Sequence, residues 1–488
     1  MTAATVPQDL GRVWALRRSE RSLLAWCLLC MTLGFTLVLG SVHSGGRVIG
    51  IADLLPLFTY ALCLICLHLV LVAIRFRGDP ILVAAGAFLA GFGLLAQYRL
   101  GAFDGPDAQA LYLFPAGVLI MVAVVAAFMG GRYRVLAAGP WVWGGLSLAM
   151  VAVLLITGQR FRGGVYALGF TTPTEVLKLS VVVFIAGFVG RHAQTLAQWD
   201  RRLHLPLPPW RPLWPLAAFW AALAGLLMAQ RDLGMIVILS VALLAMLVAG
   251  TRRPGYLVFG LLAAGGLGYL MTAVFEHGRR RIEAWQDPFA DPTGDGWQIL
   301  QGLSGMYSGG LWGEGFGQGS PGYTPIARSD FVYSVVGEEV GFVGGVLVVL
   351  FFLIVFSRGM RIARRSHDQI GMLLATGLTA VLATQTFLNV GGVTKFVPLT
   401  GITLPFISHG GASLLTAFAT LGLLLAISDT GTGSPRKASR PARSPRAGVR
   451  GQAKAPNKTP AETQTKPTPR RKRASKRAPG SGDDGAAG

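Results

Sequence analysis

Three aspartates in a stretch rich in glycine and proline offer the clearest chemistry in this sequence. Asp287, Asp291 and Asp295 recur at every fourth position within residues 277–333, and a proline follows each of the first two. Proline argues against an uninterrupted helix, so these carboxylates are not simply one charged helical face. A carboxylate in such a loop can act as a general base that removes the proton of a hydroxyl group.

Glycines follow the aspartates at high density, in the stretch 308–319. Glycine allows the backbone to approach another group closely, and that group can be a ligand such as a phosphate. The same glycines can instead form turns that only shape the loop. The sequence leaves both interpretations open.

Ionisable residues also occur within apolar stretches. Glu175 and Lys178 are spaced by three, Asp232 begins one apolar stretch, and Glu338 and Glu339 open another. Charges at membrane depth are costly and usually pair with each other or line a wet cavity that has a function. Glu175 and Lys178 can form a simple neutralising pair, but together with Asp232 and the loop they favour a polar cavity.

The elements that must position these residues are membrane spans. The chain of 488 residues is 52% hydrophobic and only 14% charged, whereas soluble proteins carry about 25% charge. We predict an all-α polytopic membrane protein of about twelve transmembrane helices, with a long extracellular loop between spans nine and ten. The expected spans are 22–42, 51–74, 80–97, 110–129, 141–157, 173–190, 214–230, 233–250, 256–275, 334–356, 371–390 and 414–428.

Arginines follow every second expected span, and four precede the first. This is the positive-inside pattern, and it predicts that both termini are cytoplasmic. The N-terminal segment 1–21 is then cytoplasmic, and residues 276–333 face outward.

The C-terminal segment 429–488 changes to Pro, Ala, Ser, Thr, Lys and Arg. Residues 436–488 hold 15 Lys or Arg and three acidic residues, which accounts for +12 of the chain's net charge of +21. Such a composition predicts a disordered cytoplasmic tail that stays near the anionic inner leaflet. A nucleic-acid partner is not expected.

The four cysteines form two C-x-x-C pairs, Cys27 with Cys30 and Cys63 with Cys66. Packing between helices is the expected role. A metal site or a disulfide between the two spans is the alternative.

Several ordered sequence blocks resemble the SEDS family (RodA, FtsW, SpoVE) of bacterial cell-wall polymerases. The stretch 285–298 resembles a family loop motif with two D-P pairs, and 309–317 and 329–344 resemble the two blocks that follow it. Further similar blocks are 175–179, 230–234 and 408–413. The resemblance covers about residues 79–428, so 22–78 are expected to be two extra N-terminal transmembrane helices before a catalytic membrane core.

The resemblance implies a peptidoglycan glycosyltransferase that polymerises lipid II at the outer face of the bacterial cytoplasmic membrane, in elongation or division. It also implies release of undecaprenyl diphosphate and a partner of the class B penicillin-binding proteins. No cofactor is required by the residues, although a divalent cation (Mg or Mn) bridging diphosphate and carboxylate fits the chemistry. The alternatives are a lipid II flippase and a noncatalytic scaffold.

By the resemblance, Asp291 is the expected catalytic base, and one base suffices because the diphosphate is a fair leaving group. Lys178 and the loop arginines would neutralise the diphosphate. Glu175 and Asp232 would hold the cavity helices and Lys178 in place. The residues expected to contact substrate are Glu175, Lys178, Asp232, Arg281, Gln298, Asp330 and Ser408.

Overall fold

The computed structural model of the chain describes residues 11, 13–15, 17–44, 48–101, 109–161, 164–166, 173–202, 205–274 and 276–430. The predicted basic tail therefore lies almost wholly outside the described residues, as does most of the segment before residue 17. The described part belongs to one compact unit, Met1–Ser434.

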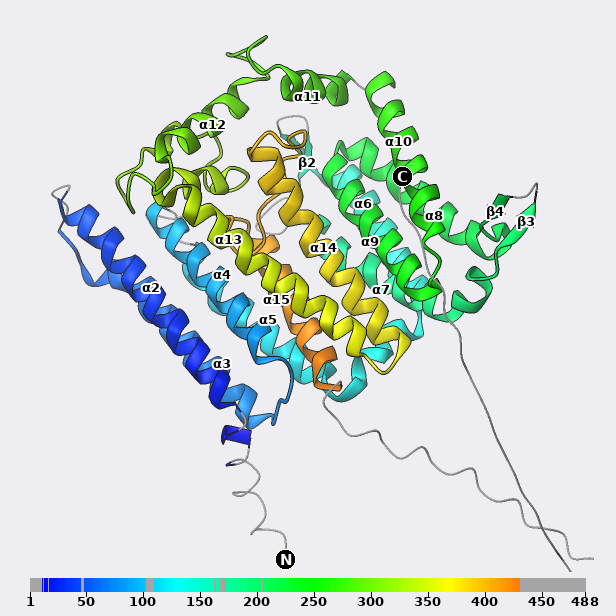
Figure 1. The fold of residues 1–488 in the computed structure, drawn as a ribbon, viewed down its shortest axis with the longest axis horizontal. Coiled ribbons are helices and arrows are strands. Elements are labelled where there is room, and N and C mark those ends of the chain that lie inside the picture. Colours follow the sequence, from blue (N-terminus) through cyan, green and yellow to red (C-terminus); the bar gives the residue numbers. More distant parts are fainter. Residues whose placement is uncertain are drawn as a thin grey trace, which may run out of the picture. The chain divides into compact units, whose positions relative to one another are not determined.

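Long α-helices form nearly all of the regular structure (Figure 1). They are α2 (Arg18–Ser44), α3 (Ile51–Ala73), α4 (Pro80–Arg99), α5 (Gln109–Phe128), α6 (Pro140–Thr157), α7 (Pro173–Leu196), α8 (Trp210–Gln230), α9 (Leu233–Thr251), α10 (Gly255–Val274), α13 (Val332–Arg365), α14 (Gln369–Val393) and α15 (Gly411–Thr430). The shorter elements are the helices η2 (Met129–Ala138), α11 (Glu276–Gln286), α12 (Trp297–Gly309) and η3 (Pro321–Tyr323), and two hairpins of the strands β1 (Gln159–Phe161) with β2 (Gly164–Tyr166) and β3 (Asp200–Arg202) with β4 (Leu205–Leu207).

The prediction of an all-α polytopic membrane protein is confirmed. Within the described residues, eleven helices are long and apolar enough to cross a membrane. The remaining predicted span, 256–275, corresponds to α10. Its apolar part, Gly255–Gly266, is shorter than the length required for a membrane span. The predicted outer loop is not a simple loop, because it contains α11 and α12 on either side of the turn that holds the aspartates.

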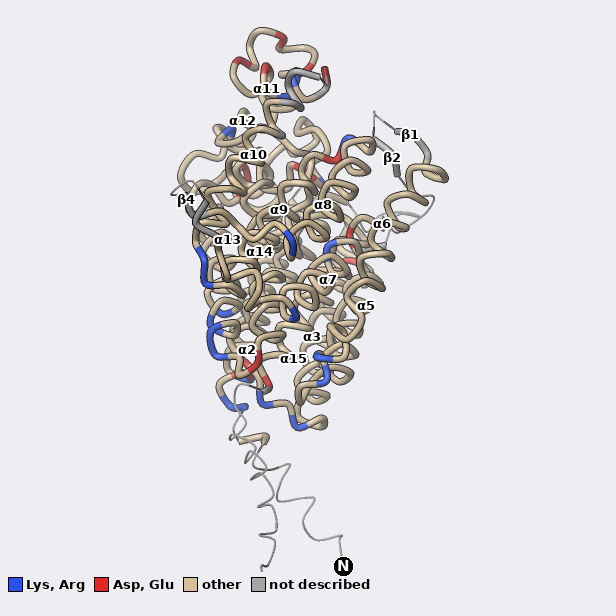
Figure 2. The backbone as a smooth tube through the Cα atoms, turned by 90° about the vertical axis from the view of Figure 1, so that its right-hand side faces the viewer, with Lys and Arg blue, Asp and Glu red and all other residues tan. Residues whose placement is uncertain are grey.

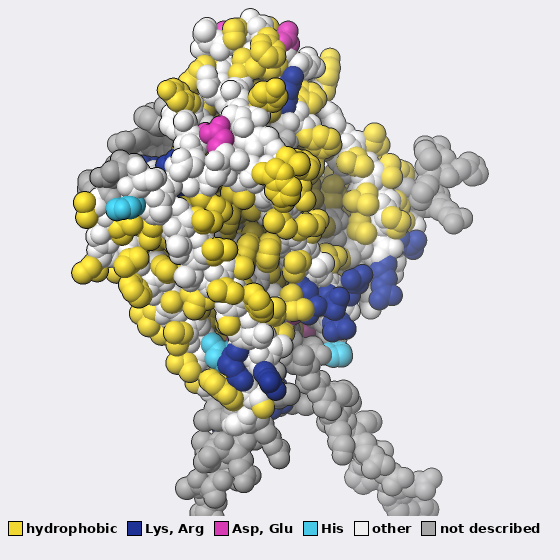
Figure 3. Space-filling model, turned by 60° about the vertical axis from the view of Figure 1, so that its left-hand side comes forward, with side chains coloured by type: hydrophobic (Ala, Val, Ile, Leu, Met, Phe, Trp, Pro, Cys, Tyr) yellow, Lys and Arg dark blue, Asp and Glu magenta, His cyan; other side chains and the backbone are white. Residues whose placement is uncertain are grey.

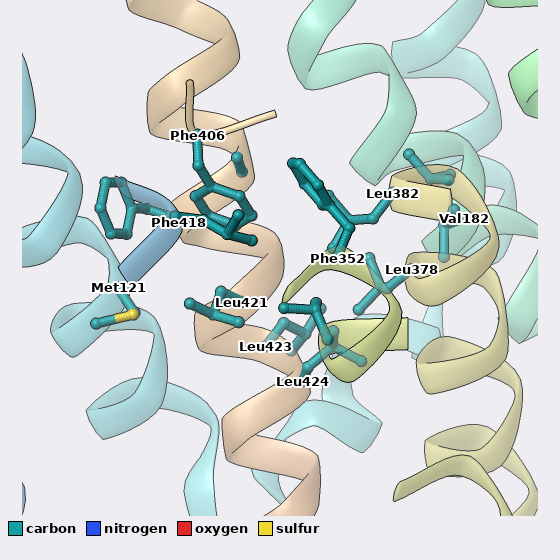
Figure 4. Close-up of a cluster of buried hydrophobic side chains, with 14 of the residues drawn as sticks. Met121, Val182, Phe352, Leu378, Leu382, Phe406, Phe418, Leu421, Leu423 and Leu424 are labelled. Atoms are coloured by element: carbon teal, nitrogen blue, oxygen red, sulfur yellow. The ribbon is translucent and has the colours of Figure 1, made fainter. Parts of the chain in front are cut away.

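Closely packed pairs of helices build the buried centre, to which α4 also contributes as the most deeply buried span. Helix α15 packs along α5, α14 packs between α13 and α9, and α7 contacts α6, α9 and α14. Figure 4 shows side chains of this core, among them Met121, Phe352 and Phe418. Small residues let the backbones approach closely in a membrane bundle. At Gly422 of α15, a Cβ atom would lie 2.7 Å from the carbonyl oxygen of Met121 in α5.

Helices α2 and α3 lie at one edge of the bundle, where α2 packs on α4 and α3 on α5 (Figure 1). The Tyr60 hydroxyl donates to the Ala87 carbonyl at 3.0 Å. Near the other end of the pair, Arg17 donates to the Phe76 carbonyl at 2.8 Å and pairs with the buried Glu20. These contacts join the N-terminal helices to the bundle.

Aspartates cap several helices, as the short polar side chain at a helix start predicts. Asp79 accepts hydrogen bonds from the backbone of Ile81 and Leu82 in α4, and Asp368 accepts one from Gly371 in α14. Asp232 does the same at α9, where it accepts from the Met235 N–H at 3.0 Å. Asp232 is thus fixed at a helix start between α8 and α9.

The surface separates into apolar and charged regions. Figure 3 shows hydrophobic side chains across the middle of one face. In Figure 2, most Lys and Arg gather toward the end opposite α11 and α12, whereas acidic residues occur in the turn that joins these two helices. An apolar belt of this kind suits a lipid environment.

Candidate functional site

Asp291 lies in the turn that joins α11 to α12, and it is exposed to solvent. One carboxylate oxygen accepts from the Gly294 N–H and the other from the Asp295 N–H, both at 3.0 Å. The turn is further closed by a backbone bond from Gly296 to Asp291 at 3.1 Å. A Cβ atom at Gly294 would clash with the Asp291 carboxylate. The two prolines do interrupt the helix as predicted, and the result is a fixed orientation for this carboxylate.

Helix α11 is anchored at the side that faces the bundle. Arg281 donates to the carbonyls of Leu399 and Thr400 at 3.3 and 3.1 Å, and the Trp285 indole donates to the Lys395 carbonyl at 3.0 Å. The neighbouring Arg279 and Arg280 instead form exposed ion pairs within α11. Of the three consecutive arginines, Arg281 is therefore the one that connects the Asp291 turn to the bundle.

The glycine-rich stretch 309–319 docks on a break in α13. Gly341 has φ +72° and interrupts the helix, and a Cβ atom there would lie 2.3 Å from the Gly313 nitrogen. The backbone N–H groups of Glu314 and Gly315 donate to the carbonyls of Glu338 and Glu339 at 2.9 and 3.0 Å. The glycines at these positions therefore allow close packing of backbone on backbone, as the interpretation of structural turns predicts.

Lys178 is buried, with 4% of its surface exposed. Its ammonium lies 2.5 Å from a Glu175 oxygen and donates to the Gln385 amide oxygen at 2.8 Å. The predicted pair thus exists, and it lines a cavity with Gln385, Ser413 and Thr416. Gln385 is not among the residues predicted to contact substrate, because its only local signal is a glutamine inside an apolar span.

Two further carboxylates interact electrostatically with Arg281. Asp232 interacts with Glu175, Lys178 and Arg281, and Asp330 interacts with Arg281. Asp330 precedes α13, and burial raises its pKa above the ordinary 3.8, although the Ser329 hydroxyl and Arg281 oppose the shift. The structure thus links five of the predicted substrate-contacting residues: Glu175 and Asp232 interact with Lys178, and Arg281 interacts with Asp232 and Asp330. We call these five residues the Lys178 group.

Ser408 lies beside Ser329, the residue before Asp330, and Gln298 lies on α12. The buried Ser408 hydroxyl donates to the Ser329 carbonyl at 2.6 Å and accepts from the Leu404 N–H at 2.8 Å, so it holds two loops together. Gln298 lies in the first turn of α12 and is partly exposed. Within the part of the chain that the structure describes, Asp291 bonds to its own turn and to no member of the Lys178 group.

The structure holds all four cysteines as free thiols, with Cys27 and Cys63 buried and Cys30 and Cys66 exposed. The disulfide alternative is thus not realised. Among the described residues, no three His, Cys, Asp or Glu side chains are grouped so that they could hold a metal ion.

Comparisons with known proteins agree on one family. The family model described as cell cycle protein, which covers FtsW, RodA and SpoVE, matches residues 106–432. Peptidoglycan glycosyltransferase RodA of Mycobacterium tuberculosis is 36% identical over 367 residues, 72% of this chain and 78% of that protein. Stage V sporulation protein E of Bacillus subtilis is 35% identical over 275 residues, 56% of this chain and 72% of that protein.

The fold is also similar to that of a solved structure. A chain of a peptidoglycan synthase complex, described as coordinating polymerization and crosslinking, matches with a TM-score of 0.58 at 24% identity. The match covers 73% of this chain and 99% of that chain.

Proposed function

We propose that this chain, which belongs to the FtsW, RodA and SpoVE family of cell cycle proteins, is a peptidoglycan glycosyltransferase. It would join lipid II units into glycan strands and release undecaprenyl diphosphate. The observation that carries the proposal is one arrangement. Arg281 holds the exposed Asp291 turn to the carbonyls of Leu399 and Thr400, and it interacts electrostatically with Asp232, which in turn interacts with the buried Lys178.

The two levels of this arrangement fit the two parts of a lipid-linked sugar. A diphosphate lies at the membrane surface and needs cations, which Lys178 and Arg281 would supply. The sugars extend into water, where the exposed Asp291 carboxylate lies. Asp232 and Glu175 keep the cationic side chains in place, and Asp330, Gln298 and Ser408 are proposed to shape the substrate contacts around them.

Asp291 would act as the general base. The acceptor hydroxyl is a poor nucleophile, and a carboxylate within hydrogen-bond distance removes its proton as the new glycosidic bond forms at the anomeric carbon. The bond to the diphosphate breaks on the opposite face, so the configuration inverts. A second catalytic carboxylic acid is not needed, in contrast to a glycosidase.

A glycosyltransfer assay tests the proposal. Purified wild-type protein, incubated with labelled lipid II, is expected to form glycan chains longer than the dimer. The same protein in vesicles reports translocation of the lipid II headgroup, which a flippase would carry out without forming polymer. Translocation without polymer would support the flippase. If the protein shows neither activity, a noncatalytic scaffold is the function that remains.

The remaining proposals concern location and partners. We propose that the basic end in Figure 2 faces the cytoplasm of a bacterium, with both termini there, because arginines accumulate on that side. Residues 22–78 would be an accessory helical pair, 79–428 the catalytic core with 276–333 outside the cell, and 429–488 a membrane-associated tail. A class B penicillin-binding protein is the proposed cross-linking partner.

A further inference from the structure

A set of hydrogen bonds around the Lys178 ammonium joins three helices with one loop. Lys178 and Glu175 come from α7, Gln385 from α14 and Thr416 from α15. The Thr416 hydroxyl oxygen lies 3.2 Å from the same Glu175 oxygen, and it lies 2.8 Å from the Ala412 carbonyl, the nearer acceptor for its single proton. The apolar wall of the cavity includes Leu382, which is labelled in Figure 4. Each polar group here is buried or nearly so, so its partners are few and defined.

The Gln385 amide can take only one orientation. Its nitrogen donates to the Thr403 carbonyl at 3.0 Å, and a carbonyl oxygen accepts only from the nitrogen side of the amide. The amide oxygen then faces Lys178, whose ammonium has hydrogens to donate and cannot accept. Both partners therefore require the same orientation, and Gln385 is a fixed acceptor 2.8 Å from the Lys178 nitrogen.

This geometry leaves one N–H of the buried ammonium without an acceptor among the described residues. Lys178 carries three N–H donors. Among the described residues they meet two acceptors, the Glu175 carboxylate and the Gln385 amide oxygen. Two fixed acceptors determine the direction of the third N–H. Without Gln385, the ammonium would turn freely about the Glu175 carboxylate, and that direction would be lost.

We propose that Gln385 is a positioning residue, which holds the Lys178 ammonium so that its third N–H is presented to a diphosphate oxygen of the lipid substrate. This inference rests on the proposed function, because it assigns the ligand of Lys178. Gln385 itself would not touch the substrate. It acts through Lys178, and its effect should disappear when Lys178 has no ammonium.

The test measures binding of undecaprenyl diphosphate to the purified full-length protein in nanodiscs. Gln385→Met keeps the length of the side chain and removes the acceptor. We expect about tenfold weaker binding, the size typical of losing a hydrogen bond to a charged group. In the glycosyltransfer assay the same variant should raise KM for lipid II more than it lowers kcat.

A double-mutant cycle separates positioning from structural damage. Lys178→Met should weaken binding, and adding Gln385→Met to it should cause no further loss. Gln97→Met is the matched control, because Gln97 is equally buried and donates to the carbonyls of Arg328 and Ile407 at 3.1 and 2.9 Å. It should lower the Tm without changing diphosphate binding. If Gln385→Met does not fold, Gln385→Asn, which is too short to reach Lys178, takes its place.

Two results would overturn the inference. One is unchanged diphosphate binding in the Gln385 variant that folds, and the other is an equal loss from that variant with and without the Lys178 ammonium. Either result alongside active wild-type protein rejects the role of Gln385 alone. A wild-type protein that neither binds the diphosphate nor polymerises lipid II rejects the proposed function itself.

Discussion

The Arg99 guanidinium lies 2.7 Å from the Glu339 carboxylate, and this ion pair joins the end of α4 to the break in α13. Arg99 also donates to the carbonyls of Gly317 and Gly319 at 3.2 and 2.8 Å. The second Glu339 oxygen accepts from the Gly317 N–H at 3.2 Å. One ion pair therefore fixes both the helix break and the glycine-rich stretch 309–319 that docks on it.

Arg99→Met should destabilise the protein strongly. The change leaves the Glu339 carboxylate, of which 5% is exposed, without its cation, and breaking such a pair costs about 3–5 kcal/mol. The measurement is thermal unfolding in detergent. The double variant Arg99→Met with Glu339→Met should recover part of the loss, since no unpaired charge remains. A double variant less stable than Arg99→Met alone would contradict this account of the pair.

Asp291→Asn should abolish lipid II polymerisation and leave the protein folded. The amide oxygen can still accept one of the two backbone hydrogen bonds of the turn, but it cannot take a proton from the acceptor hydroxyl. We expect a loss of at least about 100-fold in kcat, the lower range for removal of a general base. Polymer yield and Tm are measured together.

Asp287→Asn is the matched control for Asp291. Asp287 belongs to the same exposed turn and accepts from the Phe289 N–H at 3.0 Å, a bond that asparagine keeps. Its activity should stay within about twofold of wild type. Equal activity in the Asp291 and Asp287 variants would remove Asp291 from the role of base.

Arg281→Ala should reduce polymerisation far more than Arg279→Ala. Arg281 tethers α11 through two carbonyls and contributes to the field around Asp232 and Asp330, whereas Arg279 pairs with Glu283 on the exposed side of the same helix. We expect a decrease of about tenfold or more in kcat/KM for Arg281→Ala, equal to at least about 1.4 kcal/mol. A similar decrease in both variants would show that general positive charge, rather than the tether, is what matters.

Asp330→Asn should raise stability at neutral pH while lowering activity. Burial raises the pKa of Asp330 in the folded protein, so folding favours the protonated carboxyl group. Its ionisation therefore removes stability as pH rises through the folded pKa, and below the unfolded value of about 3.9 this cost is absent. Asparagine cannot ionise.

The Tm of Asp330→Asn should thus exceed that of wild type at pH 7, and the difference should shrink as the pH approaches 4. A wild-type protein that is the more stable of the two at pH 7 would mean that the charged form of Asp330 is stabilised by its surroundings. Glycan synthesis is measured on the same samples, because a substrate contact at Asp330 predicts a loss of activity despite the higher Tm.

The sequence by itself determined that the chain is a bundle of membrane helices and roughly where each one lies. It did not predict α11 and α12, and α7 and α13 run past their predicted ends to Leu196 and Arg365. Hydropathy gave the spans, since every apolar stretch of about 20 residues must satisfy its backbone within a helix at membrane depth. Pro288 and Pro292 identified the turn that carries Asp291, because proline cannot continue a helix. The pair of Glu175 and Lys178 was also readable, because residues three apart share a helix face.

Only the tertiary structure decided which of several equivalent residues act together. Arg279, Arg280 and Arg281 are identical in type and adjacent, yet only the third reaches the carbonyls of Leu399 and Thr400. Gln385 meets Lys178 across 207 positions of the chain. Helical periodicity indicates which residues share a face of a helix. Which helix lies against that face depends on how the helices pack, and the packing is set by contacts between segments far apart in sequence.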